Sequence, residues 1–455
     1  MATAAETLAA YGAGLDPATL PAPVVHAARR CILDGVGVAL AGAGTPWVER
    51  ALAAARALGG DGPARVIGHA QRRPPALAAL VNGTAVHALD YDDDPAACHI
   101  GAVVIPTALA LGEVLGVPGR RILAAVVLGY DVTTRVADGI DADLLYHKGY
   151  HPTAVCGVFG AAATAAYLHG LDAERFADAL GLAGSFAAGN MEFLADGAMS
   201  KRVQPGKAAH DGIVAAELAR AGVTGPRTVL EGRYGLWRYT ESLDAAAFTK
   251  GLGTRFAVTE VFVKKHASCL ANAPAIDGVL ELLQHAGVGP AGIAEIRVGL
   301  RPSSFAMVGE PRELRVRPQT MLDAQMSLPY SLAVAIVDGE AGIAQFAPER
   351  LRDPAVLALA ERIHPYSHPE LAGAKAGNLT SYVEITTSGS QHLARCFTTY
   401  RGHPELPMTD EELEAKFRRC AALRVPDSRV EAACRAIWRL DALPDLDPLL
   451  TAISG

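Results

Sequence analysis

The residues best suited to do chemistry lie together in one short segment of the chain. Residues 83–106 contain four aspartates within five positions, one histidine before them and one after: Asp90, Asp92, Asp93, Asp94, His87 and His99. Both flanks are apolar and rich in small residues, which is typical of buried segments and not of a solvated acidic run. Carboxylates and imidazoles at the border of a core often have shifted pKa values, and such groups frequently transfer protons.

Helix capping is the simplest interpretation of these acids. Aspartate is favoured at the N-cap and in the first turn of a helix, and a helix is expected to begin just after His99. A cap uses one acid or two, however, and Asp90 directly follows Leu89 on an apolar segment. We therefore expect Asp90 to point inward, and we take Asp90 and His99 as candidate acid–base residues.

A third candidate, His151, directly precedes a helix predicted over residues 154–168. Pro152 suits the first turn of that helix, and the free backbone N–H groups at a helix N-terminus favour an anion. The alternative interpretation is a turn histidine whose ring is satisfied by neighbouring groups.

A basic segment follows, containing Lys201, Arg202 and Lys207. The Pro205-Gly206 pair predicts that this segment is a loop ahead of a helix over residues 211–221. Basic loops are usually solvated, but cations ahead of a helix N-terminus can also hold carboxylates.

The character of the chain changes near Lys264. The run before it, residues 256–263, is β-branched and aromatic and predicts a strand. Lysines after such a run usually mark emergence into solvent. Lys264 also stands at a predicted domain junction, and clefts are common at such junctions.

Composition excludes several functional classes. The chain has 455 residues and a formal net charge of −7, which argues against a nucleic-acid binder. Seven scattered cysteines without a Cys-x-x-Cys pair indicate a reducing, cytoplasmic environment. The N-terminus does not resemble a signal peptide. The stretch from 149 to 171 lacks Asp, Glu, Lys and Arg, and we interpret it as a buried helix and not as a membrane span.

The histidine spacing does not favour a metal site. The two pairs spaced four apart, His147/His151 and His364/His368, are interrupted by glycine or proline, and no His-Glu-x-x-His occurs. A nucleophilic serine is not favoured either, because Gly-x-Ser-x-Gly is absent.

Hydrophobic periodicity predicts a mainly α fold. Helices are predicted through the first 260 residues, among them 76–89, 102–115, 122–136 and 173–182. Strands are predicted at 296–300 and in a hairpin over 383–397, with helices at 275–283, 321–337 and 354–363 between them, and helices return at 410–420 and 428–440. The predicted domains are a large all-helical domain, 1–262, completed by 404–455, and an α+β domain, 263–403.

Several motifs, taken in order, resemble the MmgE/PrpD family, which includes 2-methylcitrate dehydratases, cis-aconitate decarboxylases and iminodisuccinate epimerases. The resemblance runs nearly end to end. It rests on Asn82-Gly-x-x-x-His-Ala-Leu-Asp-Tyr-Asp-Asp93 with His99, Gly149-Tyr-His-Pro-Thr153, Gly184-Ser-x-Ala-Ala-Gly189 through Lys201-Arg-x-x-Pro-Gly206, Asp323-Ala-Gln-x-Ser-Leu-Pro-Tyr330, and Gly402-His-Pro-Glu-x-Pro-Met408 followed by Lys416-Phe417.

The resemblance implies a large helical domain and a smaller α+β lid domain, with the active site between them. It also implies a homodimer, a small polycarboxylate substrate, and neither a metal nor an organic cofactor. The matching polar positions are Asp90, His99, His151, Lys201 and Lys264.

The shared chemistry would remove a proton from carbon next to a carboxylate, with positive charge stabilising the enediolate. Lys201 and Lys264 would bind carboxylates, His99 and His151 would act as acid and base, and Asp90 would orient a histidine or act as base. We expect a dehydratase first, with an epimerase or a decarboxylase as alternatives on the same scaffold.

The chain departs from the family pattern at several positions. Ile100-Gly101 follows His99 where the family often has Pro-Ser, and His266-Ala-Ser-Cys269 stands where Tyr-Pro-Ser-Cys is frequent. Gln204 and Ala273 stand where histidines are common. These two differences motivate an alternative of another class, a non-catalytic ligand-binding paralogue.

Overall fold

The computed structural model describes residues 2–94, 97–373 and 379–455. The described residues are mainly helical with small sheets, which confirms the predicted fold class. The chain divides into a helical unit and an α+β unit. The helical unit comprises Met1–Ala88, Asp92–Val261 and Thr409–Gly455, and the α+β unit comprises Leu89–Tyr91 and Phe262–Met408. The assignment of residues 89–91 to the α+β unit was not predicted.

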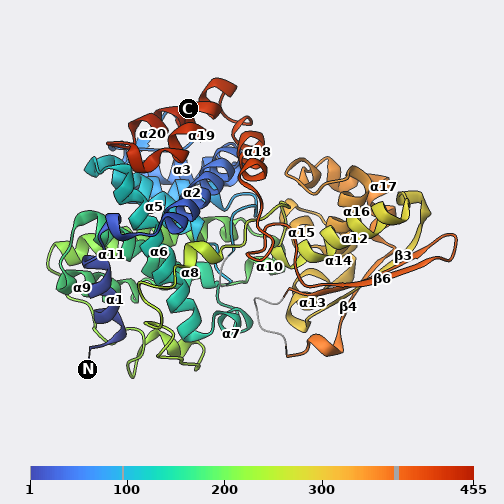
Figure 1. Cartoon of the computed structure of the whole chain (residues 1–455), viewed down its shortest axis with the longest axis horizontal. Helices are drawn as coiled ribbons and strands as arrows, with labels where there is room; N and C mark the ends of the chain where they lie inside the picture. Colours follow the sequence, from blue (N-terminus) through green and yellow to red (C-terminus); the bar gives the residue numbers. More distant parts are fainter. Residues whose placement is uncertain (1, 95–96, 374–378) are drawn as a thin grey trace. The chain divides into compact units, whose positions relative to one another are not determined.

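The helical unit consists mostly of α-helices (Figure 1). They are α1 (Ala4–Ala13), α2 (Ala22–Gly42), α3 (Pro46–Gly59), α4 (Pro75–Val86), α5 (Gly101–Leu115), α6 (Gly119–Ile140), α7 (Ala142–His147), α8 (Pro152–His169), α9 (Ala173–Ala183), α10 (Phe193–Asp196), α11 (Ser200–Arg220), α18 (Asp410–Ala421), α19 (Asp427–Trp438) and α20 (Asp447–Ile453). Short 3-10 helices add η1 (Pro17–Thr19), η2 (Leu236–Tyr239), η3 (Ala257–Glu260) and η9 (Leu440–Ala442), and β1 (Ala64–Arg65) pairs with β2 (Arg72–Arg73).

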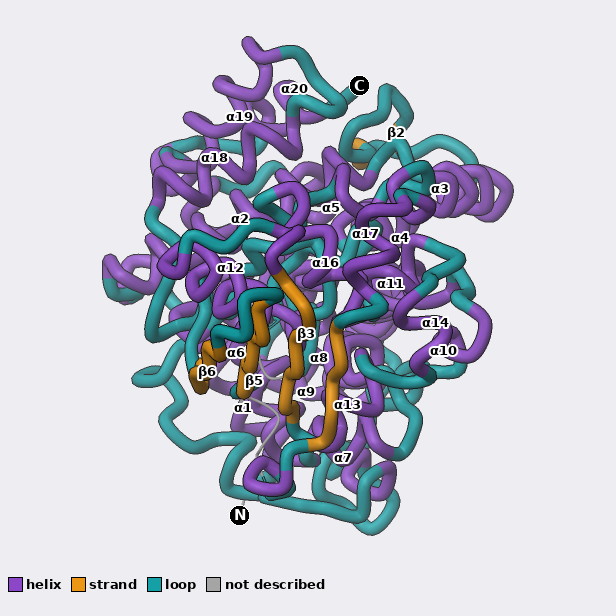
Figure 2. The backbone as a smooth tube through the Cα atoms, turned by 90° about the vertical axis from the view of Figure 1, so that its right-hand side faces the viewer, coloured by secondary structure: helices purple, strands orange, loops and turns teal. Residues whose placement is uncertain are grey.

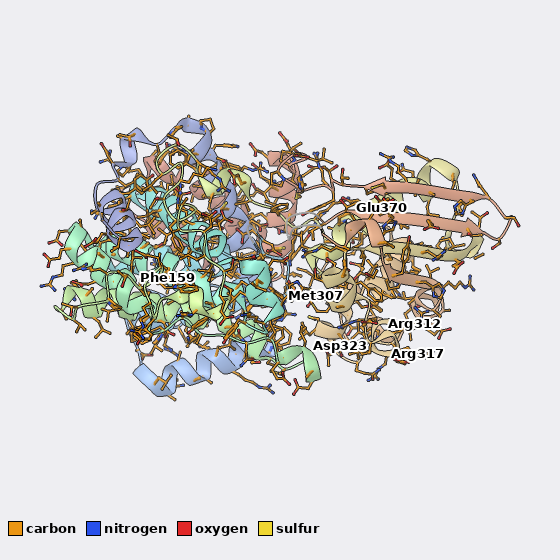
Figure 3. The ribbon with its side chains drawn as sticks, turned by 90° about the horizontal axis from the view of Figure 1, so that it is seen from below. Phe159, Met307, Arg312, Arg317, Asp323 and Glu370 are labelled. Atoms are coloured by element: carbon orange, nitrogen blue, oxygen red, sulfur yellow. The ribbon has the colours of Figure 1, made fainter. Side chains whose placement is uncertain are left out.

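Helix α8 is the centre of the helical unit. It packs against α5, α6, α9 and α11. Its sequence is dominated by alanine and glycine, and small side chains let neighbouring helices approach closely. Phe159, in the middle of α8 (Figure 3), is fully buried. The charge-free stretch is therefore a core helix, as predicted.

Within the described ranges, no helix alone has both the length and the apolar character needed to cross a bilayer. Helices α2 and α3 meet that test only as a pair, and the chain bends by 91° where they join.

Helix α11 corrects the prediction of a loop around Lys201. The helix begins at Ser200 and contains Pro205. The local Pro-Gly signal is overridden by packing, because Gly206 lies directly against α4: a Cβ added there would be 2.1 Å from the carbonyl oxygen of Leu80. Only a glycine allows the two helix backbones to approach so closely.

Replacing Gly206 by alanine is expected to lower the free energy of unfolding by about 1–3 kcal/mol, because the new methyl group forces α4 and α11 apart. Urea unfolding of the purified variant measures the effect. Gly116 is the matched control, since no atom lies within 4 Å of a Cβ built there. Its left-handed backbone makes some loss from Gly116→Ala expected, about 1 kcal/mol. A Gly206→Ala loss no larger than this would contradict the packing argument.

The C-terminal helices pack back on the first part of the chain, as predicted. Helix α18 lies beside α2 (Figure 1). At this contact the Lys416 ammonium lies 2.6 Å from a carboxylate oxygen of Asp34, and both side chains are about 2% exposed.

The α+β unit contains α12 (Ala273–Ala286), α13 (Pro302–Val308), α14 (Arg312–Val316), α15 (Met321–Gln325), α16 (Leu328–Asp338), α17 (Pro354–Ala360), and the 3-10 helices η4 (Leu270–Asn272), η5 (Pro290–Gly292), η6 (Ala344–Phe346), η7 (Arg350–Arg352) and η8 (Pro369–Leu371). Its sheet is formed by β3 (Ile293–Leu300), β4 (Ile363–Ser367), β5 (Ser381–Thr387) and β6 (His392–Phe397). The strand order is β4-β3-β5-β6, and β6, β5 and β3 can be followed side by side in Figure 2.

The alternating patterns correctly predicted β3 and the β5–β6 hairpin. Strand β3 pairs with β5 antiparallel and with β4 parallel, so that Ile296 lies opposite Ile385 on one side and Ile363 on the other. Strand β4 was missed. Its Pro365 argues against a strand in sequence, but β4 is at the edge of the sheet, where proline is tolerated.

Two other predictions in this region are wrong in detail. Residues 256–263 do not form a strand: they include η3, and the Ala257 N–H donates to Asp131 Oδ1 at 2.6 Å instead of to a neighbouring strand. The predicted helix over 321–337 is interrupted after Gln325, because Ser327 caps the start of α16 through the N–H of Tyr330.

Candidate active site

Two groups of buried polar side chains contain the predicted site residues. The first, in the helical unit, is built from α4, α5, α8 and α11 and includes His87, Asp92, His99 and His151, which we call the histidine cluster. The second, in the α+β unit, is the Asp90–Lys264 pair.

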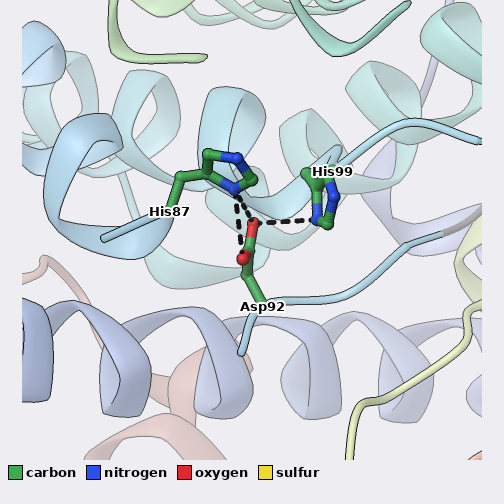
Figure 4. A group of neighbouring side chains, drawn as sticks. All are labelled: His87, Asp92 and His99. Atoms are coloured by element: carbon green, nitrogen blue, oxygen red, sulfur yellow. Dashed lines mark hydrogen bonds and ion pairs between the residues drawn. The ribbon is translucent and has the colours of Figure 1, made fainter. Parts of the chain in front are cut away.

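Asp92 joins two imidazoles of the histidine cluster (Figure 4). His87, the residue that ends α4, directs Nδ1 at the Asp92 carboxylate, 2.9 Å from Oδ2 and 3.2 Å from Oδ1. Nδ1 of His99, just before α5, lies 3.2 Å from Asp92 Oδ2. The two rings are tilted, with centroids 4.5 Å apart. An ionised carboxylate only accepts hydrogen bonds, so the contact between His87 and Asp92 places the proton of the neutral His87 ring on Nδ1 and leaves its Nε2 with a lone pair.

Burial determines the charges in this group. Desolvation lowers the pKa of His87 to about 3, even though the neighbouring Asp92 favours the charged form. Burial by itself would raise the pKa of Asp92, but His87 and His99 together hold it well below its usual range. Near neutral pH, Asp92 is therefore ionised and His87 is neutral.

His151 lies at the N-cap of α8, and Pro152 occupies the first turn, as predicted. Its side chain is 1% exposed, its ring centroid is 6.1 Å from that of His87, and its Nδ1 lies 2.9 Å from Oε1 of Gln204. Desolvation lowers its pKa well below the usual range, and the charges of His87 and Lys201 act in the same direction. His151 is thus neutral near pH 7.

Helix α11 supplies two cations to the same part of the helical unit. Lys201 and Arg202 are in its first turn and are only 2% and 3% exposed, respectively. Arg202 donates to the backbone carbonyl of His87 at 3.3 Å. Lys201 lowers the pKa values of both His87 and His151 through its charge, which places a buried ammonium beside neutral imidazoles.

Asp93 satisfies a backbone N–H at the start of α5 from outside the helix, although the N-cap residue itself is Ile100 and not one of the acids. It accepts a hydrogen bond from the N–H of Gly101, at the start of α5, at 2.9 Å, and another from the hydroxyl of Tyr130. Desolvation raises its pKa to about 7. Asp92 and Asp93 are both buried, and the helix-capping interpretation is wrong for Asp92, whose carboxylate binds His87 instead.

Asp90 points inward, as predicted. It adopts the left-handed backbone region with φ 52°, and its Oδ1 accepts a hydrogen bond from Lys264 Nζ at 2.6 Å. Lys264 also donates to the backbone carbonyl of Asp90 at 3.0 Å, and both side chains are almost fully buried. This ion pair was not predicted, and it means that the Lys264 charge is already balanced by a carboxylate.

The helical unit therefore brings together His99, His151 and Lys201, while the α+β unit pairs Asp90 with Lys264. Three residues in or beside the histidine cluster were not selected as candidates from the sequence: His87, Asp92 and Gln204. The spacing of five residues between His87 and Asp92 carries no recognisable signal, because it depends on where α4 ends. Gln204 was noted only as a departure from the family pattern.

His87, Asp92 and His99 are also, among the described residues, the group that could hold a metal ion, since their candidate ligand atoms lie within 4.8 Å of one another. A histidine that binds a metal usually donates its second ring nitrogen to a further acceptor. The His87 Nε2 atom is buried without a hydrogen-bond partner. The geometry fits a hydrogen-bonded His–Asp–His group better than a metal site.

Dialysis against a strong chelator is accordingly expected to leave turnover and thermal stability unchanged, with less than about 0.1 metal ion per chain by elemental analysis. Addition of Zn²⁺ or Mn²⁺ after dialysis serves as the control. A loss of activity on chelation that either metal restores would show that these three side chains bind a metal.

The chain matches known families over most of its length. Residues 6–248 match the MmgE/PrpD N-terminal domain and residues 266–441 match the MmgE/PrpD C-terminal domain. A cis-aconitate decarboxylase of Aspergillus terreus (strain NIH 2624 / FGSC A1156) is 31% identical over 471 residues, which cover 98% of this chain and 94% of the relative. The cis-aconitate decarboxylase-like protein oryM of Aspergillus oryzae is 30% identical, with coverage of 97% and 95%. A cis-aconitate decarboxylase of Mus musculus is 26% identical, with coverage of 99% and 93%. The chain belongs to the MmgE/PrpD family.

Proposed function

We propose that this protein is a cofactor-independent lyase that decarboxylates a small unsaturated tricarboxylate of the cis-aconitate type. Several relatives, matched over nearly the whole chain, are named cis-aconitate decarboxylases. The observation that carries the proposal is the pairing of a buried ammonium, Lys201, with imidazoles that are neutral near pH 7.

Decarboxylation of such a substrate requires above all a cation that stabilises the carbanion formed when CO₂ leaves. Cleavage of the bond to one carboxylate releases CO₂ and leaves an electron pair. In a substrate whose carboxymethyl group is attached to a double bond, this pair moves across the double bond to the carbon next to another carboxylate. The resulting enediolate is stabilised by positive charge, for which Lys201 is the candidate. One proton then bonds to that carbon and completes the product.

His151 is the candidate carrier of this proton. Its imidazole is neutral in the free protein, so one ring nitrogen has a lone pair that can accept a proton. A bound tricarboxylate places negative charge nearby and raises the affinity of the imidazole for a proton. His151 can then take up a proton from solvent and deliver it to the carbanion. His99, held by Asp92, is the second candidate for this role.

Dehydration, the reaction first expected from sequence, is less well supported. The relatives matched over nearly the whole chain are named cis-aconitate decarboxylases.

The test is a panel of cis-aconitate, 2-methylcitrate, citrate and iminodisuccinate, followed by NMR in heavy water. The proposal predicts that cis-aconitate is consumed with release of CO₂, and that the product carries one deuterium on the carbon next to a carboxylate. Alkene formation from 2-methylcitrate without CO₂, or epimerisation of iminodisuccinate with deuterium exchange, would overturn it in favour of the other reaction. Binding of these acids without turnover would indicate a non-catalytic paralogue.

A further inference from the structure

Gln204 is a residue of α11 that makes two hydrogen bonds with defined direction. Its Nε2 lies 2.9 Å from the backbone carbonyl of Asn190, and its Oε1 lies 2.9 Å from Nδ1 of His151. A carbonyl oxygen only accepts hydrogen bonds, so the amide nitrogen of Gln204 must face Asn190. The amide oxygen then faces His151, and Nδ1 of His151 must donate.

This chain of donors and acceptors determines the tautomer of His151. With a proton on Nδ1 and a neutral ring, Nε2 carries the lone pair. We propose that Gln204 is a positioning residue: it holds His151 in this tautomer, so that the proton used in the reaction enters and leaves at Nε2. The inference rests on the proposed function for its kinetic consequence, but the tautomer itself follows from the hydrogen bonds alone.

The surrounding backbone holds Gln204 in place. The N–H of His151 donates to the carbonyl of Gly189 at 3.1 Å, so the same short segment binds both the backbone of His151 and the side chain of Gln204. Gly189 is closely packed there, since a Cβ built on it would lie 2.7 Å from Oε1 of Gln204. Because the Gln204 amide is already held in one orientation, its hydrogen bond to the imidazole costs little side-chain conformational entropy.

A histidine, common in the family at this position, would behave differently. A neutral imidazole at position 204 has one donor nitrogen and one acceptor nitrogen, and these swap roles when the ring changes tautomer. In the glutamine amide the nitrogen always donates and the oxygen always accepts. Gln204 therefore restricts His151 to one tautomer, whereas a histidine at this position would allow two. In that tautomer His151 accepts a proton at Nε2 whenever the ring is neutral.

The test uses the full-length protein labelled with ¹⁵N-histidine and the variant Gln204→Met, which keeps the side-chain length but cannot accept the proton of Nδ1. The chain has 14 histidines, so His151→Gln is used to assign the resonance. We expect the wild-type spectrum to show His151 protonated on Nδ1, and Gln204→Met to show a substantial population protonated on Nε2. With cis-aconitate as substrate, kcat should fall about 10- to 100-fold while KM changes by less than about twofold.

Tyr239→Phe is the matched control, because the Tyr239 hydroxyl donates to the carbonyl of Ala187 at 3.1 Å and so holds the same segment without contacting His151 through that bond. It should retain wild-type kcat and the wild-type tautomer. The proposal would be overturned if wild-type His151 were protonated on Nε2. It would also be overturned if Gln204→Met left the tautomer or kcat unchanged, or if Tyr239→Phe lost as much activity as Gln204→Met. If the wild-type protein turns over no polycarboxylate, the proposed function fails, while the spectra still decide the tautomer.

Discussion

Replacing His151 by glutamine is expected to lower kcat by about 100- to 10,000-fold, the usual contribution of a positioned acid–base group. The side chain is buried at the start of α8 and neutral near pH 7, and glutamine cannot carry the proton that the carbanion requires. KM for cis-aconitate should change much less, because Lys201 is unchanged. Steady-state kinetics on the folded variant, with circular dichroism to verify the fold, measure the effect.

His169 provides the control for this variant. It lies at the opposite end of α8, where its Nε2 is 3.1 Å from Glu217. His169→Gln should retain kcat within about threefold, since surface or half-buried changes away from the site act on stability by only fractions of a kcal/mol. A loss of activity in His169→Gln as large as that in His151→Gln would indicate that α8 is merely sensitive to substitution. Full activity of His151→Gln would exclude His151 as the proton carrier.

Replacing Lys416 by methionine is expected to lower the free energy of unfolding by about 3–5 kcal/mol. The Asp34 carboxylate is buried between α2 and α18, and its pKa is raised by desolvation even with Lys416 beside it. Removal of the ammonium leaves either an uncompensated buried charge or a protonated acid. Urea unfolding at pH 7, followed by tryptophan fluorescence, measures the loss in the helical unit, where Trp47, Trp237 and Trp438 all lie.

The double variant Asp34→Asn/Lys416→Met distinguishes the ion pair from simple packing. If the unpaired charge causes the loss, removing both charges should recover a large part of it, because the effects of residues in contact are not additive. Arg418→Met, which breaks exposed ion pairs on the same helix, should cost less than about 1 kcal/mol. A double variant less stable than Lys416→Met would contradict the charge argument.

Hydrophobic periodicity was sufficient to predict the elements that need only an apolar neighbour and not one particular residue elsewhere in the chain. Strand β5 alternates buried and partly exposed residues because one face of the sheet is buried, and the middle of β3 does the same. This requirement can be recognised in each strand separately. Helix α8 was predictable for a similar reason: its small apolar residues can only pack inside a helical core.

The errors occurred where a distant residue decides the local conformation. Residues 256–263 have strand-forming side chains, yet the N–H of Ala257 binds the carboxylate of Asp131, a residue of α6 far away in sequence. Pro205-Gly206 resembles a turn, yet the close approach of α4 makes this glycine part of a helix crossing. Local propensity is weak compared with such tertiary contacts.

The sequence by itself determined the mainly α fold and the return of the C-terminal helices to the first part of the chain. It also selected five polar residues that the structure buries: His99, His151, Lys201, Asp90 and Lys264. Only the tertiary structure decided that the rings of His87 and His151 are neutral near pH 7 and that each carries its proton on Nδ1. A pKa and a tautomer depend on burial and on partners such as Asp92 and Gln204, which come from other elements of the fold, and no local pattern in the sequence records those distances.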